Sequence, residues 1–254
     1  MKKTFVHSQK GAALIVVLLL LVVITLIGVM AIRQSLTSLN VATNSQINEL
    51  LRQSSDAVML AFETTNQFSQ LNSATGILGF IRQPENLNKE LVFCFQKGQN
   101  LALNISQASL VQVNTSGQIN SLAFGERGFC KPKENKFYTS KRNAVITQVT
   151  VKRAPVSNDQ PFSNYVVGTD IVSAKTQNND RFLIYATSLV PSVGGASKEK
   201  IYQCLSRYMS SQSAISALDD ETTKKNLTVS TCLEQLGVPF NTQVAEYNYV
   251  TGFK

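Results

Sequence analysis

Histidine and tryptophan are almost absent from this chain of 254 residues, which has one His and no Trp. The single histidine, His7, precedes a long apolar run, so the rest of the chain has no imidazole for a catalytic triad, a general base or a histidine metal site. The sequence also has no phosphate-binding glycine loop and no nucleophile elbow. We therefore expect a protein that is not an enzyme and that has no catalytic residue, metal site or cofactor.

Carboxylates are missing from the N-terminal part, where none precedes Glu49, although the whole chain has 16 acidic and 24 basic residues. Residues 12–32 carry no charge of either sign. As a helix they span about 32 Å, which matches a hydrocarbon core of about 30 Å. Lys2, Lys3 and Lys10 precede this segment, and basic flanks stay on the cytoplasmic side. We therefore expect one transmembrane span with a cytoplasmic N-terminus. A secretory signal peptide has a shorter apolar region of about 7–15 residues.

A stripe of mostly apolar residues continues beyond the span at spacings of three and four, which is typical of an amphipathic helix. Its members are Leu36, Leu39, Thr43, Ile47, Leu50, Leu51, Val58, Ala61 and Phe62. No proline interrupts residues 1–83. The pattern therefore predicts one helix from Ala12 to about Phe68, on the order of 85 Å long.

The rest of the chain alternates short runs of strand composition with turn-forming residues. Strands are predicted at 91–96, 101–106, 145–151, 164–172 and 181–190, of which 144–151 and 182–190 are expected to be central. Residues 198–209 are expected to extend the last strand pair, and 214–221 to form a short helix. The sequence predicts an α+β fold in which an antiparallel sheet packs on the long helix.

Four cysteines, Cys94, Cys130, Cys204 and Cys232, all follow the membrane segment. Four cysteines allow three pairings, and the spacings suggest Cys94 with Cys130 and Cys204 with Cys232. Bridges of this loop length contribute about 3–4 kcal/mol each. A zinc site is the competing interpretation, but neither a CxxC spacing nor a nearby histidine favours it. Disulfides fit the oxidising compartment that the predicted topology gives to this part of the chain.

The residues around the start of the apolar run, Gln9-Lys10-Gly11 followed by Ala12-Ala13, form a short basic leader that ends in glycine. This arrangement resembles the type III leader of type IV pilins and pseudopilins. The resemblance implies that a prepilin peptidase cuts after Gly11 and methylates the new N-terminus at Ala12. Because the cut precedes the apolar helix, the helix is retained. A plain signal anchor that never joins a filament is the alternative.

The fifth residue after this cleavage position is Val16, where ordinary pilins carry glutamate. The same gap is a feature of K-type pseudopilins and of PilX-type minor pilins, and the run from Gln9 to Arg33 is similar to the PilX N-terminal segment. The resemblance covers roughly residues 8–60. It implies a leader at 1–11, a long helix at 12–70 with its span at 12–32, and a periplasmic or extracellular β-rich head at 71–254. It also implies a C-terminal disulfide loop.

By resemblance, the chain is expected to prime and assemble a type IV pilus at or near the tip, and so to support motility, adhesion or DNA uptake. The implied partners are the prepilin peptidase, other minor pilins, the major pilin, the inner membrane and a tip adhesin. The alternatives are a K-type pseudopilin of a type II secretion system, a DNA-binding competence pilin and a membrane-anchored enzyme. K-type pseudopilins bind calcium, for which the acidic run 219–221 is a candidate, although such a run is more often a solvated turn.

A basic stretch is the remaining candidate for binding a nucleic acid or an acidic partner. Its members are Arg127, Lys131, Lys133, Lys136, Lys141, Arg142, Lys152 and Arg153, against the single carboxylate of Glu134. Phe137 and Tyr138 lie inside the stretch, where exposed rings would stack on bases. A solvated loop is the alternative interpretation and the favoured one.

Overall fold

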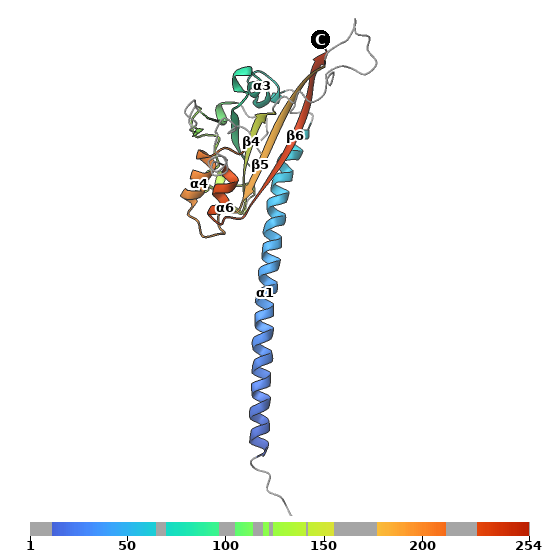
Figure 1. Ribbon diagram of the computed structural model, residues 1–254, viewed down its shortest axis with the longest axis vertical. Helices are drawn as coiled ribbons and strands as arrows, with labels where there is room; N and C mark the ends of the chain where they lie inside the picture. Colours follow the sequence, from blue (N-terminus) through green and yellow to red (C-terminus); the bar gives the residue numbers. More distant parts are fainter. Residues whose placement is uncertain are drawn as a thin grey trace, which may run out of the picture. The chain divides into compact units, whose positions relative to one another are not determined.

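The computed structural model describes residues 12–64, 70–96, 105–113, 119–121, 124–140, 142–154, 177–211 and 228–253. The chain divides into two compact units, residues 1–46 and residues 47–254. Helix α1 (Ala12–Glu63) begins in the first unit and ends in the second. Figure 1 shows α1 as one continuous helix. At about 1.5 Å per residue, its 52 residues correspond to about 78 Å. The predicted helix is present, but it ends at Glu63 and not near Phe68.

An antiparallel sheet forms the centre of the second unit, and its strand order is β3-β2-β1-β4-β5-β6. The strands are β1 (Glu90–Phe95), β2 (Ser109–Val113), β3 (Ile119–Asn120), β4 (Ile146–Arg153), β5 (Gln177–Leu189) and β6 (Phe240–Phe253). The strands predicted at 91–96, 145–151 and 181–190 correspond to β1, β4 and β5. The two runs expected to be central, β4 and β5, pair with each other inside the sheet. The predicted α+β fold with an antiparallel sheet is confirmed.

One face of the sheet packs against residues 47–63 of α1. Val58 and Phe62 of the helix are buried together with Phe93 of β1, Val149 of β4 and Ile184 of β5. Strand side chains alternate between faces, so the inward-facing residues of the three strands form one apolar surface. The short helix α3 (Ile77–Ile81) closes this core with its own buried side chains. Burial of each large apolar side chain contributes about 1.5–3 kcal/mol.

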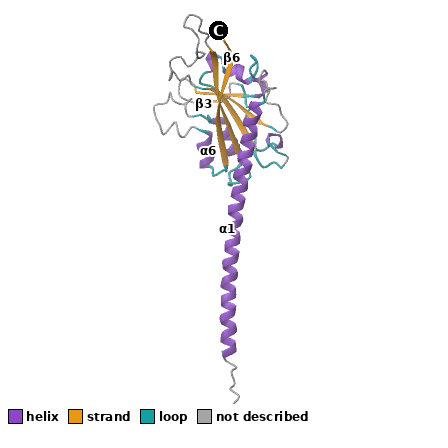
Figure 2. Cartoon of the chain, turned by 90° about the vertical axis from the view of Figure 1, so that its right-hand side faces the viewer, coloured by secondary structure: helices purple, strands orange, loops and turns teal. Residues whose placement is uncertain are grey.

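The opposite face carries two further helices, α4 (Lys198–Arg207) and α6 (Val229–Gln235). Leu205 of α4 and Leu233 of α6 are buried in one cluster with Ile146 of β4 and Leu189 of β5. Figure 2 shows α1 and α6 on opposite sides of the strands. The sheet is therefore buried on both faces, which explains why β4 lacks a simple apolar–polar alternation.

Two sequence-based expectations for this region are wrong. Residues 198–207 form helix α4, not a strand, because Ser197 accepts a hydrogen bond from the backbone N–H of Lys200 and caps the helix. Its buried residues, Ile201, Cys204 and Leu205, then recur at helical spacing. Residues 105–107, whose first two positions belong to the strand predicted at 101–106, form a 3-10 helix. The strand predicted at 164–172 and the helix at 214–221 lie outside the described residues.

Two disulfides join Cys94 to Cys130 and Cys204 to Cys232, the pairs that the spacing suggested. The second bridge links α4 to α6 across 28 positions of sequence. We expect replacement of both Cys204 and Cys232 by serine to lower the free energy of unfolding by about 3 kcal/mol, because the unfolded chain gains loop entropy. Urea unfolding of the full chain in detergent micelles measures this change. An unchanged urea midpoint and an unchanged slope of the unfolding transition would show that this bridge does not stabilise the fold.

Candidate functional site

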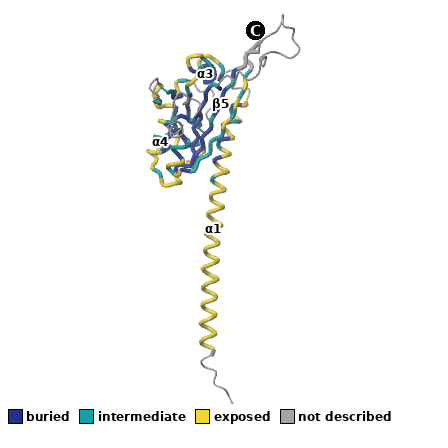
Figure 3. Tube along the Cα trace, in the orientation of Figure 1, coloured by how far each residue is buried: buried dark blue, intermediate teal, exposed yellow. Residues whose placement is uncertain are grey.

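The N-terminal part of α1 is apolar on every side and is exposed along its whole length. Leu14 is 65% exposed, Leu21 53% and Ile32 63%. Figure 3 shows this part of the helix without a buried residue. Among the described residues, one helix, α1, has the length and the apolar composition needed to cross a membrane. Leu, Ile and Val each favour membrane insertion by about 0.3–0.6 kcal/mol at the helix centre, so this surface fits an environment of lipid or of other apolar helices.

The first turns of α1 contain two of the three residues that are expected to act in processing and assembly, Ala12 and Val16. Gly11 lies outside the described residues, and Ala12 is the first residue of the helix. Val16 lies one turn further along and is 60% exposed. No acidic residue occupies the first turn, and the first carboxylate in α1 is that of Glu49. The apolar segment therefore avoids the cost of about 2.5–3.5 kcal/mol that a charge at the centre of a bilayer carries.

The predicted stripe of α1 has two different environments. Leu51, Val58 and Phe62 are buried within the second unit. Leu36 and Leu39, in the first unit, are 57% and 62% exposed. The exposed part of the stripe continues the apolar surface of the span beyond its charged end at Arg33, which is the arrangement that helix-to-helix packing requires.

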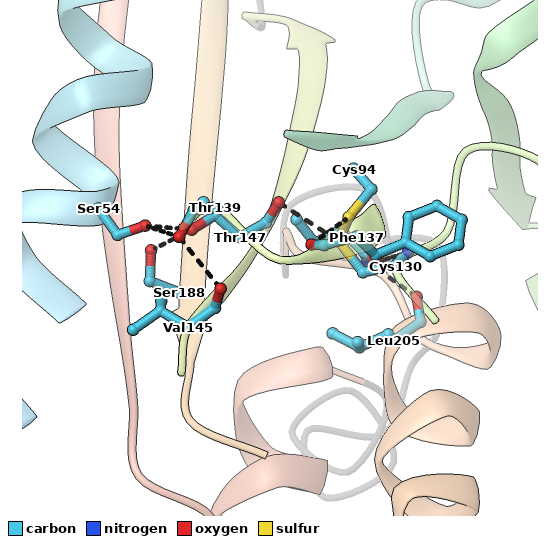
Figure 4. Close-up of a disulfide and its surroundings, with 10 residues drawn as sticks. Ser54, Cys94, Cys130, Phe137, Thr139, Val145, Thr147, Ser188 and Leu205 are labelled. Carbon is cyan, nitrogen blue, oxygen red and sulfur yellow. Dashed lines mark hydrogen bonds between the residues drawn. A yellow bond between two sulfur atoms is a disulfide. The ribbon is translucent and has the colours of Figure 1, made fainter. Parts of the chain in front are cut away.

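A seam of small hydroxyl side chains joins residues 47–63 of α1 to the sheet (Figure 4). The Oγ of Ser54 lies 2.7 Å from Oγ1 of Thr147, and the Oγ of Ser55 lies 2.8 Å from that of Ser188. Thr147 and Ser188 are also 2.8 Å apart. Short side chains let the helix approach the strands closely, and their hydrogen bonds satisfy buried polar atoms. These hydrogen bonds therefore fix the position of residues 47–63 of α1 on the sheet.

The basic stretch does not form one surface. Lys152 and Arg153 are consecutive residues of β4 and point to opposite faces. Lys152 is buried, whereas Arg153 lies 3.6 Å from the carboxylate of Asp180. Lys133 pairs with Glu199 at 2.6 Å. Lys141 lies outside the described residues.

Arg127, Lys131 and Lys136 are the members of the stretch that the structure brings together, since they line one cavity. Phe137 and Tyr138 are each only 5% exposed, so their rings are not available to stack on bases. The cation of Lys136 lies 5.0 Å from the centre of the Phe137 ring, which is a cation–π contact within the chain itself. Sequence proximity alone overstated the size of the basic patch.

Two buried ionisable side chains, Glu90 and Lys152, lie on the sheet face opposite α1, and nothing in the sequence indicated their proximity. Glu90 of β1 is fully buried, and its carboxylate accepts backbone N–H hydrogen bonds from Ser210 and Ser211, both at 2.8 Å. Lys152 of β4 donates to the hydroxyl of Ser211 at 2.8 Å. Burial raises the pKa of Glu90 to about 7, although the two N–H groups and the charge of Lys152 oppose this shift. The pair connects the sheet to the chain that follows α4.

Within the described ranges, no group of three or more His, Cys, Asp or Glu side chains is arranged to hold a metal ion. The acidic run 219–221 lies outside those ranges.

Comparison with known proteins gives one family match. Residues 10–59 match the family described as PilX N-terminal. Comparisons with curated proteins and with solved structures gave no match. The matched segment contains the apolar run, Val16, the exposed stripe and most of the part of α1 that packs on the sheet. The N-terminal helix, up to residue 59, is therefore similar to the N-terminal segment of PilX-type pilins.

Proposed function

We propose that this protein is a minor pilin that takes part in priming and assembly of a type IV pilus at or near its tip. The observation that carries the proposal is the apolar helix that matches the PilX family, is exposed on all sides and has no carboxylate before Glu49. The same unbroken helix enters the folded head, so anchor and head form one covalent subunit. The role is structural: the helix packs among neighbouring pilin helices.

Assembly begins with processing at the cytoplasmic face of the inner membrane. The prepilin peptidase cuts after Gly11 and methylates Ala12, which removes three lysines and lowers the formal charge from +8 to +5. The apolar helix stays in the inner membrane, and the head folds in the periplasm, where its two disulfides form. The subunit then leaves the membrane with other minor pilins and the major pilin, and its head becomes extracellular. A tip adhesin is a further partner in this position.

The absence of an acid at Val16 supports a distal position. In a pilin with glutamate at this place, the buried carboxylate pairs with the N-terminal amine of the subunit ahead, and this pairing offsets the cost of burying the charge. This protein has no carboxylate at position 16 to pair with the amine of the subunit ahead. Its own amine still accepts a carboxylate from the subunit behind. A subunit that accepts this pairing from behind but cannot make it ahead is suited to the distal end of the pilus.

The test is to restore the carboxylate. We expect Val16→Glu to move the protein from the pilus tip into the shaft, because the new carboxylate can pair with a subunit ahead. Immunogold electron microscopy of sheared pili measures the distribution. Val17→Glu is the matched control, since it places the same charge one position away from the pairing geometry. Val16→Glu labelling that stays confined to tips would contradict the distal-position argument.

Two of the alternative functions, the competence pilin and the K-type pseudopilin, have less support in the described residues. A DNA-binding competence pilin needs a basic path for the phosphate backbone, but Lys133 and Arg153 are paired with acids and Lys152 is buried. A K-type pseudopilin shares the missing glutamate. The longest described helix apart from α1 is α4, with only 10 residues, whereas K-type heads usually carry a large helical insertion.

A further inference from the structure

A cavity of about 540 Å³ lies on the head beside the Cys94–Cys130 bridge. Its lining combines cations, amides and a floor of buried rings: Phe93, Cys94, Gln96, Ser106, Gln107, Arg127, Lys131, Lys136 and Phe137. This volume lies within the range of small-molecule sites, which is about 300–1,000 Å³. None of the described lining residues belongs to α1, so the cavity is separate from the helix on which the proposed function rests.

The described lining of the cavity has three cations and no carboxylate. Among the described residues, Arg127 and Lys131 form no ion pair. Lys136 lies 2.8 Å from Glu134, whose pKa is lowered chiefly by the hydrogen bond from Lys136 and further by the charge of Lys131. The nearby Glu126 accepts a hydrogen bond from Tyr202 at 2.8 Å. The cavity therefore presents positive charge that nearby acids compensate only in part: Glu134 pairs with Lys136 and interacts with the charge of Lys131.

The backbone that carries these cations is held in place from several sides. The bridge fixes Cys130, next to Lys131, to β1. The hydroxyl of Tyr138 donates to the carbonyl of Pro132 at 2.9 Å and closes the loop that carries Lys131 and Lys136. Gly128, next to Arg127, approaches so closely that an added Cβ would lie 2.1 Å from the carbonyl oxygen of Val92. A binding site on a rigid backbone loses less entropy when its ligand binds.

We propose that this cavity binds a small phosphorylated molecule through its phosphoryl group. A phosphomonoester carries a charge of about −1.5 to −2 at pH 7 and three acceptor oxygens. The guanidinium of Arg127 matches two of these oxygens, and the ammonium groups of Lys131 and Lys136 supply point charges. The side-chain amides of Gln96 and Gln107, which also line the cavity, are suited to hydroxyl groups on the remainder of the ligand.

A nucleic acid fits this cavity less well than a small phosphorylated molecule. The rings of Phe93 and Phe137 are 1% and 5% exposed, so they form the floor and offer no free face to a base. The three cations form an isolated cluster, because Lys133 is paired with Glu199 outside the cavity lining. Backbone recognition of DNA or RNA needs a longer basic track.

The test is isothermal titration of glucose 6-phosphate into the full chain in nonionic detergent at low salt. We expect saturable binding in the low-millimolar range or tighter. Arg127→Gln and Lys131→Gln should each weaken it about tenfold, since each removes one charge-assisted interaction. Lys133→Gln is the matched control, because it removes the same charge from the same loop outside the cavity, and it should change the affinity less than twofold.

Parallel titrations with citrate, an acidic hexapeptide and single-stranded oligothymidylate test the ligand class. Weaker binding of all three than of glucose 6-phosphate supports the proposal. Equal or tighter binding of any of them overturns the phosphate assignment, and equal weakening by Lys133→Gln overturns the site. No binding of glucose 6-phosphate to the wild-type chain, when thermal unfolding shows it to be folded, also overturns the proposal.

Discussion

Replacement of Gly11 by valine is expected to leave residues 1–11 on the chain and to abolish its incorporation into pili. The proposed peptidase accepts only a small residue before the scissile bond, and a β-branched side chain does not fit. An uncut subunit also keeps Lys2, Lys3 and Lys10, which hold it at the cytoplasmic face. Intact-mass spectrometry measures the processing. Wild-type protein should begin at methylated Ala12, and the variant at or near Met1.

Gly28→Val is the matched control for this experiment, because it makes the same substitution inside the apolar helix. A Cβ at Gly28 meets no atom within 4 Å in the subunit. The control protein should therefore be cut and methylated like the wild type. If Gly11→Val were processed normally, or if wild-type protein kept its leader in cells with active peptidase, the proposed maturation would be wrong. The segment would then be a plain membrane anchor.

The second large effect concerns the stability of the head as a function of pH. Burial raises the folded-state pKa of Glu90 from 4.5 to about 7, so between these values the folded protein holds a proton that the unfolded chain has lost. The stabilising contribution of Glu90 is therefore complete below about pH 4.5 and is lost as the pH rises through about 7. A shift of this size corresponds to roughly 3 kcal/mol. Chemical denaturation between pH 4.5 and 8 measures the loss.

Glu90→Gln should remove this part of the pH dependence, because an amide does not titrate. The variant should be less stable than the wild type at pH 4.5, since the amide N–H₂ of glutamine faces a backbone donor where the carboxyl group had an acceptor. The difference should shrink or reverse by pH 8. Burial lowers the pKa of the facing Lys152 and raises that of Tyr185, so we compare slopes only up to pH 8.

Glu134→Gln is the control for Glu90→Gln. Glu134 lies on the surface beside Lys136, which lowers its pKa. Its stabilising contribution is thus lost as the pH falls below the unfolded-state value, so the slope between pH 4.5 and 7 should persist in this variant. Equal slopes in Glu90→Gln and the wild type would show that the buried carboxyl group does not titrate in this range.

The elements that were predictable from the sequence are those with a strong local signal. Helix α1 has no proline and an unbroken apolar run, β1 and β4 contain Val with Phe or Ile, and β5 contains the run Phe182-Leu183-Ile184-Tyr185. Strand β6 was missed because its sequence mixes Val244 and Tyr247 with Gln243, Glu246 and other polar residues. It is an edge strand with one face on α1, where Gln243 donates to Asp56 at 2.7 Å. The helix supplies a hydrogen-bond partner for a polar side chain of this strand, and the composition of the strand alone does not reveal that partner.

The candidate sites also differ in how far the sequence could reveal them. Gly11, Ala12 and Val16 are neighbours in sequence, so their proposed roles could be inferred without coordinates. Only part of the cavity could be predicted from the sequence. Arg127, Lys131 and Lys136 lie in one basic stretch, but Gln96 and Gln107 come from other segments. Glu90 and Lys152 are adjacent only through the pairing of β1 with β4. No spacing along the chain indicates that contact.

The sequence by itself was enough to identify the apolar helix, to predict its orientation and to suggest which cysteines pair, because each inference depends on composition or separation along one continuous segment. Only the tertiary structure decided which face of α1 the head covers, which lysines remain available to a ligand and where a carboxyl group is buried. These properties arise from residues that are distant in sequence, and burial and pairing depend on what the fold places beside each side chain.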